Sequence, residues 1–313
     1  MLQVLARPEK PLHQAKMQDG FDIICIGSVL WDVIGRSTRE MRVGSDVPGR
    51  ITMIPGGVAM NIAMTLREMG LTPALLTAIG NDPQGAQLIA KAIEMGMVTE
   101  YIHISEDQPT DRYMALEGPG GLIAAIADAH SLEAAGNTIL IPLTEGPLSS
   151  TTAPYDGVIA LDGNLTQEVL EEIAQSPAFA KADLRVAPAS PGKAERLTPL
   201  LACPNATLYV NCEEAGLLCG TQFDSAPEAA LALSKRGAAR VLVTDGGAIA
   251  CELHEGDLMT QIPPEVAVKR ITGAGDTFMA AHLAAEYKGA DRALALTAAI
   301  GAAAAYVSGE AVA

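Results

Sequence analysis

Short apolar segments alternate with amphipathic ones along most of this chain, and this alternation limits the fold more than any other feature. Residues 21–27, 157–162 and 240–244 are almost continuously apolar, as strands buried on both faces of a parallel sheet are. Helical periodicity follows in stretches such as 83–95. The repetition predicts a single α/β domain over residues 21–313, with a mostly parallel sheet covered by helices on both faces.

Residues 101–128 interrupt this alternation. Segments 112–116 and 122–126 resemble short strands, and the glycine- and proline-rich run 117–121 between them is typical of a hairpin turn. Together with residues 36–55, which contain a further strand-like run, they predict a small β-sheet outside the main one.

Charge and composition exclude several classes of partner. The chain has 21 Lys and Arg against 37 Asp and Glu, a formal net charge of −16, which argues against binding DNA or RNA. The five cysteines form no C-x-x-C pair, and the histidines lack metal-ligand spacing.

No apolar run approaches the roughly 20 residues that span a bilayer. Residues 1–20 lack a signal-peptide segment and are predicted to be a flexible extension. We expect a cytoplasmic protein with a small-molecule substrate and no nucleic-acid or membrane partner.

The run Gly273-Ala274-Gly275-Asp276 suggests an anion site. Glycines allow the backbone to turn sharply and to approach a ligand closely. An amphipathic helix is predicted over 277–288, and the free amides and dipole at a helix N-terminus attract anions. Asp276 either stabilises this terminus or acts as a general base beside a phosphate, and the motif alone leaves both readings open.

Polar residues also follow several of the predicted strands, at Asp32, 162–164, 211–214 and 244–247. In open α/β sheets ligands bind beyond the carboxyl ends of the strands. Asp32 either caps a loop or accepts hydrogen bonds from a diol such as that of ribose, and 244–247 is either an ordinary turn or a contact for nucleotide phosphates. Together with the glycine turn, these segments predict one concentrated polar site.

Two further motifs each have a structural and a functional reading. Gly56-Gly57 with Asn61 is either a strand-to-helix turn or a place where backbone amides and an amide side chain hold a substrate hydroxyl. Asn211 and Glu214 either form a helix capping box or offer the oxygen ligands that Mg²⁺ prefers.

Several catalytic motifs are missing from the sequence. It has no G-x-x-x-x-G-K-[ST] P-loop, no G-x-G-x-x-G after the first strand and no G-x-S-x-G elbow. Walker-type NTPases, dinucleotide-dependent dehydrogenases and serine hydrolases are therefore disfavoured. Phosphoryl transfer from a nucleotide to an alcohol fits best, because it needs little beyond anion-stabilising amides, a metal and one base.

In order and spacing, Gly56-Gly57 with Asn61, the run 211–214 and the run 273–276 resemble the signatures of the ribokinase-like, PfkB-type kinases of sugars and nucleosides. The resemblance extends from Phe21 to the end of the chain. It implies a three-layer α/β/α sandwich with a mostly parallel central sheet. It also implies a small β-sheet lid from about 36–55 and 99–128, through which two copies would pair as a homodimer.

The resemblance implies roles for individual residues. Asp276 would be the catalytic base, beside an anion hole formed by the amides of Gly273, Ala274 and Gly275. The residues that would hold the substrate are Asp32, Gly56, Gly57 and Asn61, with Asn164 and the lid residues Thr110 and Tyr113 as further candidates. The residues that would contact ATP are Asn211, Thr244, Gly246, Gly247 and Gly275. Asn211 and Glu214 would position Mg²⁺.

Within the family, the chain is most similar to the pseudouridine kinases, through runs such as Ile26-Gly27-Ser28, Trp31-Asp32-Val33 and Asp162-Gly163-Asn164. This similarity implies ATP-dependent phosphorylation of the 5′-hydroxyl of pseudouridine. The alternatives are another sugar or nucleoside kinase, acting on ribose, adenosine or a keto-sugar acid, and a catalytically silent nucleoside-binding protein.

Three positions depart from the family's usual pattern. Met60 stands where a cation often precedes the asparagine, and Ala187 where an aspartate usually precedes the proline. Arg270 stands where potassium-dependent relatives often have aspartate, which argues against activation by a monovalent cation such as K⁺.

Overall fold

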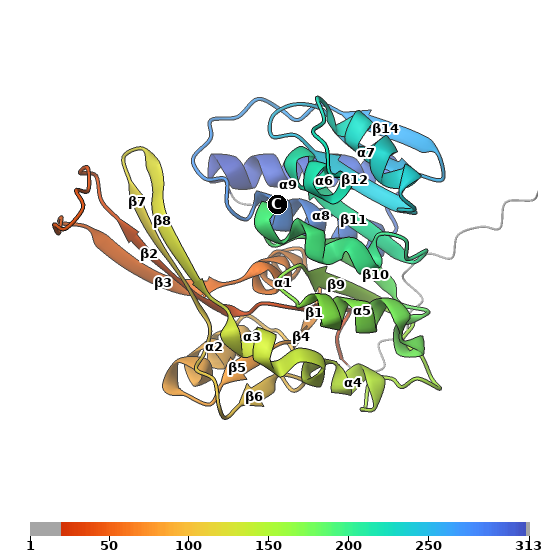
Figure 1. Cartoon of the computed structure of the whole chain (residues 1–313), viewed down its shortest axis with the longest axis horizontal. Helices are drawn as coiled ribbons and strands as arrows, with labels where there is room; N and C mark the ends of the chain where they lie inside the picture. Colours follow the sequence, from red (N-terminus) through yellow and green to blue (C-terminus); the bar gives the residue numbers. More distant parts are fainter. Residues whose placement is uncertain (1–19, 311–313) are drawn as a thin grey trace, which may run out of the picture.

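The computed structural model describes residues 20–310, so the predicted N-terminal extension lies outside it apart from Gly20. An eight-stranded sheet forms the centre, in the order β14-β13-β12-β11-β10-β9-β1-β4 (Figure 1). Its strands are β1 (Ile23–Ile26), β4 (Pro73–Leu76), β9 (Val158–Asp162), β10 (Asp183–Ala187), β11 (Ala206–Asn211), β12 (Arg240–Thr244), β13 (Ala250–His254) and β14 (Asp257–Gln261). Only the β12–β13 and β13–β14 pairings are antiparallel. The predicted mostly parallel sheet is confirmed.

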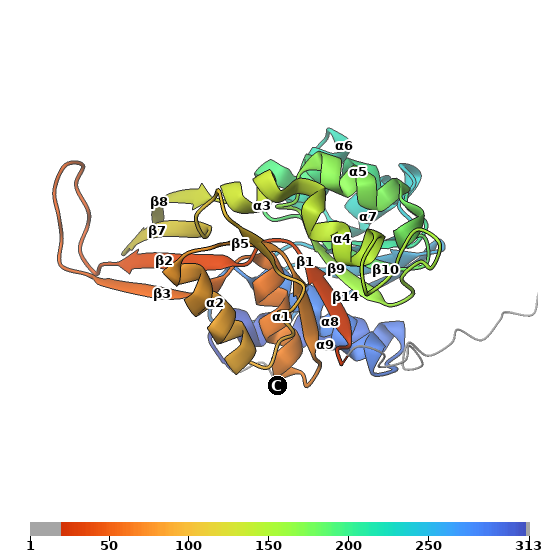
Figure 2. The same cartoon turned by 90° about the horizontal axis from the view of Figure 1, so that it is seen from below.

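Helices cover both faces of this sheet (Figure 2). One layer holds α1 (Val58–Glu68), α2 (Pro83–Glu94), α8 (Ala274–Tyr287) and α9 (Arg292–Ser308). The other holds α3 (His130–Ala135), α4 (Ile141–Thr144), α5 (Gln167–Gln175), α6 (Cys212–Cys219) and α7 (Ala226–Lys235), with the 3₁₀ helices η2 (Gly136–Leu140), η3 (Pro177–Phe179) and η4 (Pro191–Leu200). Ile24 and Ile26 of β1 pack into the core on one side, and Ile23 and Cys25 into the core on the other. Burial on both faces is the reason for the continuous apolar run.

A separate four-stranded sheet, in the order β3-β2-β7-β8, projects from the main body (Figures 1 and 2). Its strands are β2 (Leu30–Arg36), β3 (Arg50–Gly56), β7 (Arg112–Gly118) and β8 (Gly121–Asp128). This small sheet begins at Leu30, earlier than the predicted 36, because Asp32 and Gly35 are uncommon in strands and hide the pattern. Residues 99–111 do not join it, since β6 (His103–Ser105) pairs with β5 (Ala78–Gly80) instead.

None of the helices within residues 20–310 has the length and apolar character needed to span a membrane.

Buried charges fasten α8 to the central sheet. Glu286, near the end of α8, lies 2.5 Å from Arg185 of β10 and 2.5 Å from Arg240 of β12. One turn earlier, Nδ1 of the fully buried His282 lies 2.8 Å from the Tyr209 hydroxyl of β11. Burial would raise the pKa of Glu286, but Arg185, His282 and Arg240 outweigh it and lower this pKa to about 2. These contacts fix α8 against three neighbouring strands.

We expect Glu286→Gln to lower the free energy of unfolding by about 3 kcal/mol, because the substitution removes the carboxylate that two buried arginines share and leaves Arg185 only Asp183 and Arg240 only Glu252. Urea titration at pH 7 measures this loss. The loss should shrink as pH falls from about 4.5 towards 2, since protonation of Glu286 then removes the same charge from the wild-type protein. In the control Glu94→Gln, which removes an exposed partner 2.6 Å from Lys91, the change should stay below about 0.5 kcal/mol. Equal losses in the two variants would contradict the anchoring role.

Candidate active site

The N-terminus of α8 meets α1 at the carboxyl edge of the central sheet, and two predicted site residues contact each other there. Oδ2 of Asp276, in the first turn of α8, accepts a hydrogen bond from Nδ2 of Asn61 at 2.8 Å. Burial of Asp276 and the charges of Asp162, Glu214 and Asp32 raise its pKa, while the bond from Asn61 lowers it, and the result is a pKa of about 7. Asp276 therefore lies among other carboxylates and is poised to exchange a proton near neutral pH.

The turn before α8 requires glycine for two reasons. Gly273 is the N-cap residue of α8 and has φ 92°, in the left-handed region. A Cβ at this position would also collide with the hydroxyl of Tyr306. The first N–H groups of α8 have no partner within the helix, as an anion site requires. The amide of Ala274, however, donates to the Ile271 carbonyl at 3.0 Å, so an anion bound by all three predicted amides would have to replace that bond.

The predicted substrate residues Asp32, Gly56, Gly57 and Tyr113 gather where the small sheet joins α1. A Cβ on Gly56 would overlap the Asp32 carboxylate, so the glycine allows this carboxylate to lie directly against the backbone. Burial raises the pKa of Asp32 to about 6. Tyr113 of β7 is in register with Asp32 of β2, and burial together with the charges of Asp32 and Glu117 raises the pKa of its phenol. Gly57 is the N-cap residue of α1.

Two other predicted substrate residues have their polar groups engaged inside the protein. Thr110 is buried, and its hydroxyl donates to Oδ1 of Asp82 at 2.9 Å. The Asn164 side chain donates to the Ser28 hydroxyl at 2.9 Å, and its oxygen accepts from Nζ of Lys193 at 2.6 Å. These bonds favour a role for Thr110 and Asn164 in holding the site together over direct substrate contact.

The structure adds Ser28 and Lys193, which were not predicted site residues, and links them to Asp162, one of the polar residues predicted at the strand ends. Oδ2 of the fully buried Asp162 accepts from both the amide and the hydroxyl of Ser28, at 2.7 and 2.5 Å. Burial and the charge of Arg196 lower the pKa of Lys193. The position of Asp162 at the end of a buried strand was a usable sequence signal. Lys193 gave none, because it lies in the 3₁₀ helix η4.

Asn211 and Glu214 form the capping box at the start of α6. The amide of Glu214 donates to Oδ1 of Asn211, and the amide of Asn211 donates to Oε2 of Glu214, both at 2.8 Å. Burial and the charge of Glu213 raise the pKa of Glu214, while the bond from Asn211 lowers it, and the result is about 7. Asn211 is in register with Thr244 at the end of β12, so the predicted ATP residues 244–247 start beside it.

The charge around Asp276 suits a cation. Glu214, Asp162 and Asp32 each raise the pKa of Asp276, and a bound cation would relieve this repulsion. Across residues 20–310, no three His, Cys, Asp or Glu side chains are already grouped to hold a metal ion. Mg²⁺ needs no such group, because it keeps several waters and takes few protein ligands. The side chains of Asn211 and Glu214 carry the kind of oxygen that Mg²⁺ takes as a ligand, and in this structure Oδ1 of Asn211 and Oε2 of Glu214 accept the hydrogen bonds of the capping box.

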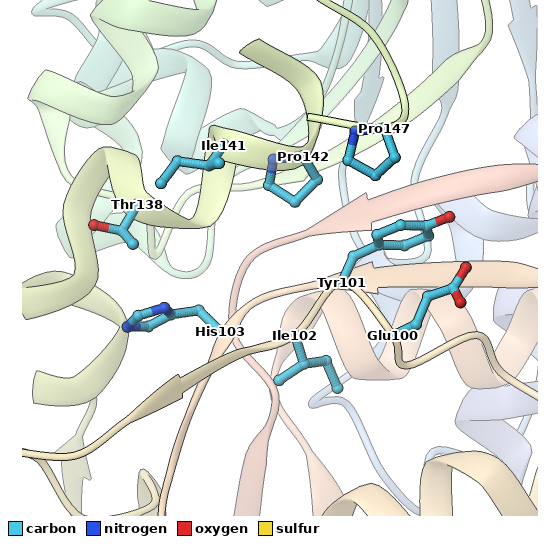
Figure 3. Close-up of a pocket in the computed structure, with 8 residues that line it drawn as sticks. All are labelled: Glu100, Tyr101, Ile102, His103, Thr138, Ile141, Pro142 and Pro147. Atoms are coloured by element: carbon cyan, nitrogen blue, oxygen red, sulfur yellow. The ribbon is translucent and has the colours of Figure 1, made fainter. Parts of the chain in front are cut away.

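A cavity of about 490 Å³ lies elsewhere on the molecule (Figure 3). Residues 100–103, which lead into β6, form one wall, and Thr138, Ile141, Pro142 and Pro147 form the other. None of the predicted site residues lines this cavity, so it is separate from the candidate active site.

Comparisons with known proteins bear on the family and the fold of this chain. The model of the pfkB family carbohydrate kinases matches residues 21–313. A pseudouridine kinase of Escherichia coli is 28% identical over 82% of this chain and 81% of its own length. A pseudouridine kinase of Arabidopsis thaliana is 26% identical over 73% of this chain and 64% of its own length. The structure of an Arabidopsis thaliana ribokinase complexed with ribose and ATP has the same fold, with a TM-score of 0.72 and 20% identity over 92% of each chain.

Proposed function

This chain belongs to the PfkB family of carbohydrate kinases, and we propose that it transfers a phosphoryl group from ATP to the 5′-hydroxyl of pseudouridine. The products would be pseudouridine 5′-phosphate and ADP. Membership of the family makes it a kinase with an alcohol acceptor, and the two relatives named as pseudouridine kinases support the choice of substrate. The observation that carries the catalytic proposal is the half-buried Asp276 at the N-terminus of α8, held by Asn61.

In this reaction the carboxylate of Asp276 takes the proton of the 5′-hydroxyl as the hydroxyl oxygen attacks the γ-phosphorus. The bond from that phosphorus to the β,γ-bridging oxygen breaks, and ADP leaves. The turn 273–275 would stabilise the transferred phosphoryl group through its amides. The raised pKa of Asp276 makes its ionised form a stronger base than an ordinary aspartate at neutral pH.

The other predicted residues divide between the two substrates. Asp32 and Asn61, next to Gly56 and Gly57, would bind the ribose hydroxyls, and Tyr113 would lie beside them.

The residues that would contact ATP are Asn211, Thr244 and the glycines 246–247. Asn211 and Glu214 would hold Mg²⁺, which supplies charge neutralisation at the phosphates. Arg270 carries a fixed positive charge near the turn, which supports a kinase that does not depend on K⁺.

We propose that the small sheet acts as a lid. It carries Asp32 and Tyr113 on its strands, so its movement towards the main body would bring them onto the substrate and exclude water.

The small sheet also exposes apolar side chains, which supports pairing of two copies through it. The most exposed of these are Ile51, Leu122, Ile123 and Ile126.

A panel of acceptors with purified protein and MgATP tests the substrate. We expect kcat/KM for pseudouridine to exceed that for uridine, adenosine, ribose and a keto-sugar acid by about tenfold or more, which corresponds to roughly 1.4 kcal/mol of discrimination. ADP release is the measurement. A higher kcat/KM for ribose or adenosine would assign the chain to another substrate, and no phosphorylation of any acceptor would contradict a kinase.

The variant Asp276→Asn tests the base. We expect kcat to fall by about two orders of magnitude or more, with little change in ATP binding, because an amide cannot take the proton. In the wild-type protein kcat/KM should fall as pH drops through about 7 and below, as Asp276 becomes protonated. The exposed Asp107→Asn variant is the matched control. Near-normal turnover of Asp276→Asn would rule out this role.

Sedimentation of the purified protein tests the pairing. We expect a dimer that Ile126→Lys converts to a monomer, because Ile126 is 68% exposed on the edge strand β8 and a buried lysine would oppose association. The control Leu294→Lys changes a similarly exposed apolar side chain on α9 and should leave the dimer intact. A wild-type monomer at micromolar concentration would refute pairing through the small sheet.

A further inference from the structure

The C-terminal helix α9 contacts the turn that leads into the predicted anion hole. The backbone amides of Lys269 and Arg270 both donate to the Val307 carbonyl, at 2.9 and 3.2 Å. Val307 is in the last turn of α9, so this helix holds the start of the turn through its backbone.

Two side chains continue this contact towards Gly273. The guanidinium of Arg270 lies over the ring of Tyr306, 3.6 Å from its centroid, and Nε of Arg270 donates to the Tyr306 carbonyl at 2.8 Å. The hydroxyl of Tyr306 in turn donates to the Thr272 carbonyl at 2.7 Å. Because a Cβ on Gly273 would meet this same hydroxyl, Tyr306 lies directly against the N-cap residue of α8.

Tyr306 is also close enough to the catalytic aspartate to be affected by its charge. Burial raises the pKa of Tyr306, Arg270 lowers it, and the carboxylates of Asp276 and Asp32 raise it further. The Tyr306 phenol therefore stays protonated and able to donate to Thr272.

We infer that Tyr306 and Arg270 are positioning residues, which hold the turn 271–275 at the place where its amides would meet the transferred phosphoryl group. This inference rests on the proposed kinase function for its effect on rate. The arrangement requires the tyrosine hydroxyl for the bond to Thr272 and the arginine for the stack that fixes the tyrosine ring. A misplaced amide stabilises the transition state less while substrate binding is almost unchanged, so the effect should appear in kcat.

The variant Tyr306→Phe tests the inference, because it removes one hydroxyl and keeps the ring beneath Arg270. We expect kcat to fall about 3- to 10-fold, the range of a single hydrogen bond, with KM for the nucleoside within about twofold. Arg270→Met should lower kcat in the same direction. The matched control is Tyr287→Phe, which removes a hydroxyl from the other end of α8, 3.0 Å from Oδ1 of Asp22, and should leave kcat unchanged.

Hydrogen–deuterium exchange gives a readout that does not depend on activity. The amides of residues 269–276 should exchange faster in Tyr306→Phe than in the wild-type protein and remain unchanged in Tyr287→Phe. Unaltered exchange in Tyr306→Phe, or a kcat equal to that of the control, would overturn the inference. A wild-type protein inactive on every acceptor would contradict the proposed function, and the exchange result would still decide whether Tyr306 holds the turn.

Discussion

The position of α8 against the central sheet is the constraint on which the rest of the structure depends. At its C-terminal end, Glu286 lies between Arg185 and Arg240, which come from two different strands. At its N-terminal end the helix supplies Asp276 and the turn 273–275. Because a helix is a rigid element, the charges buried at one end determine where the aspartate at the other end lies relative to the strand ends.

Several carboxylates lie close together in the candidate site, and their mutual repulsion affects the proposed catalytic base. Asp276 lies near Asp162, Glu214 and Asp32, and these carboxylates, together with burial, raise its pKa to about 7. Such repulsion costs stability in the ligand-free protein, as is common where catalytic groups are tuned. A bound cation would relieve this repulsion. Buried charges therefore have opposite effects in the two places. They repel one another around Asp276, whereas they attract one another around Glu286.

Several residues that the sequence analysis assigned to one site are neighbours in the structure, and the polar groups of others are engaged inside the protein. Asp276 and Asn61, which are 215 positions apart, are hydrogen-bonded. Asn211 and Glu214 form the capping box, which was one of the two readings that the sequence left open. Asn164 has both ends of its amide engaged by Ser28 and Lys193. The sequence could not show this engagement, because the partners of a polar side chain depend on which distant segments meet it.

The sequence by itself determined the parallel α/β sheet, because strands buried on both faces must be apolar throughout and helices must show their own period. It also determined the glycine turn before α8, where φ 92° and the contact with Tyr306 leave no room for a side chain. Only the tertiary structure decided what surrounds that turn. The carboxylates that raise the pKa of Asp276 and the Tyr306–Arg270 contact from α9 come from segments far apart in the chain, and no local pattern records which of them pack together.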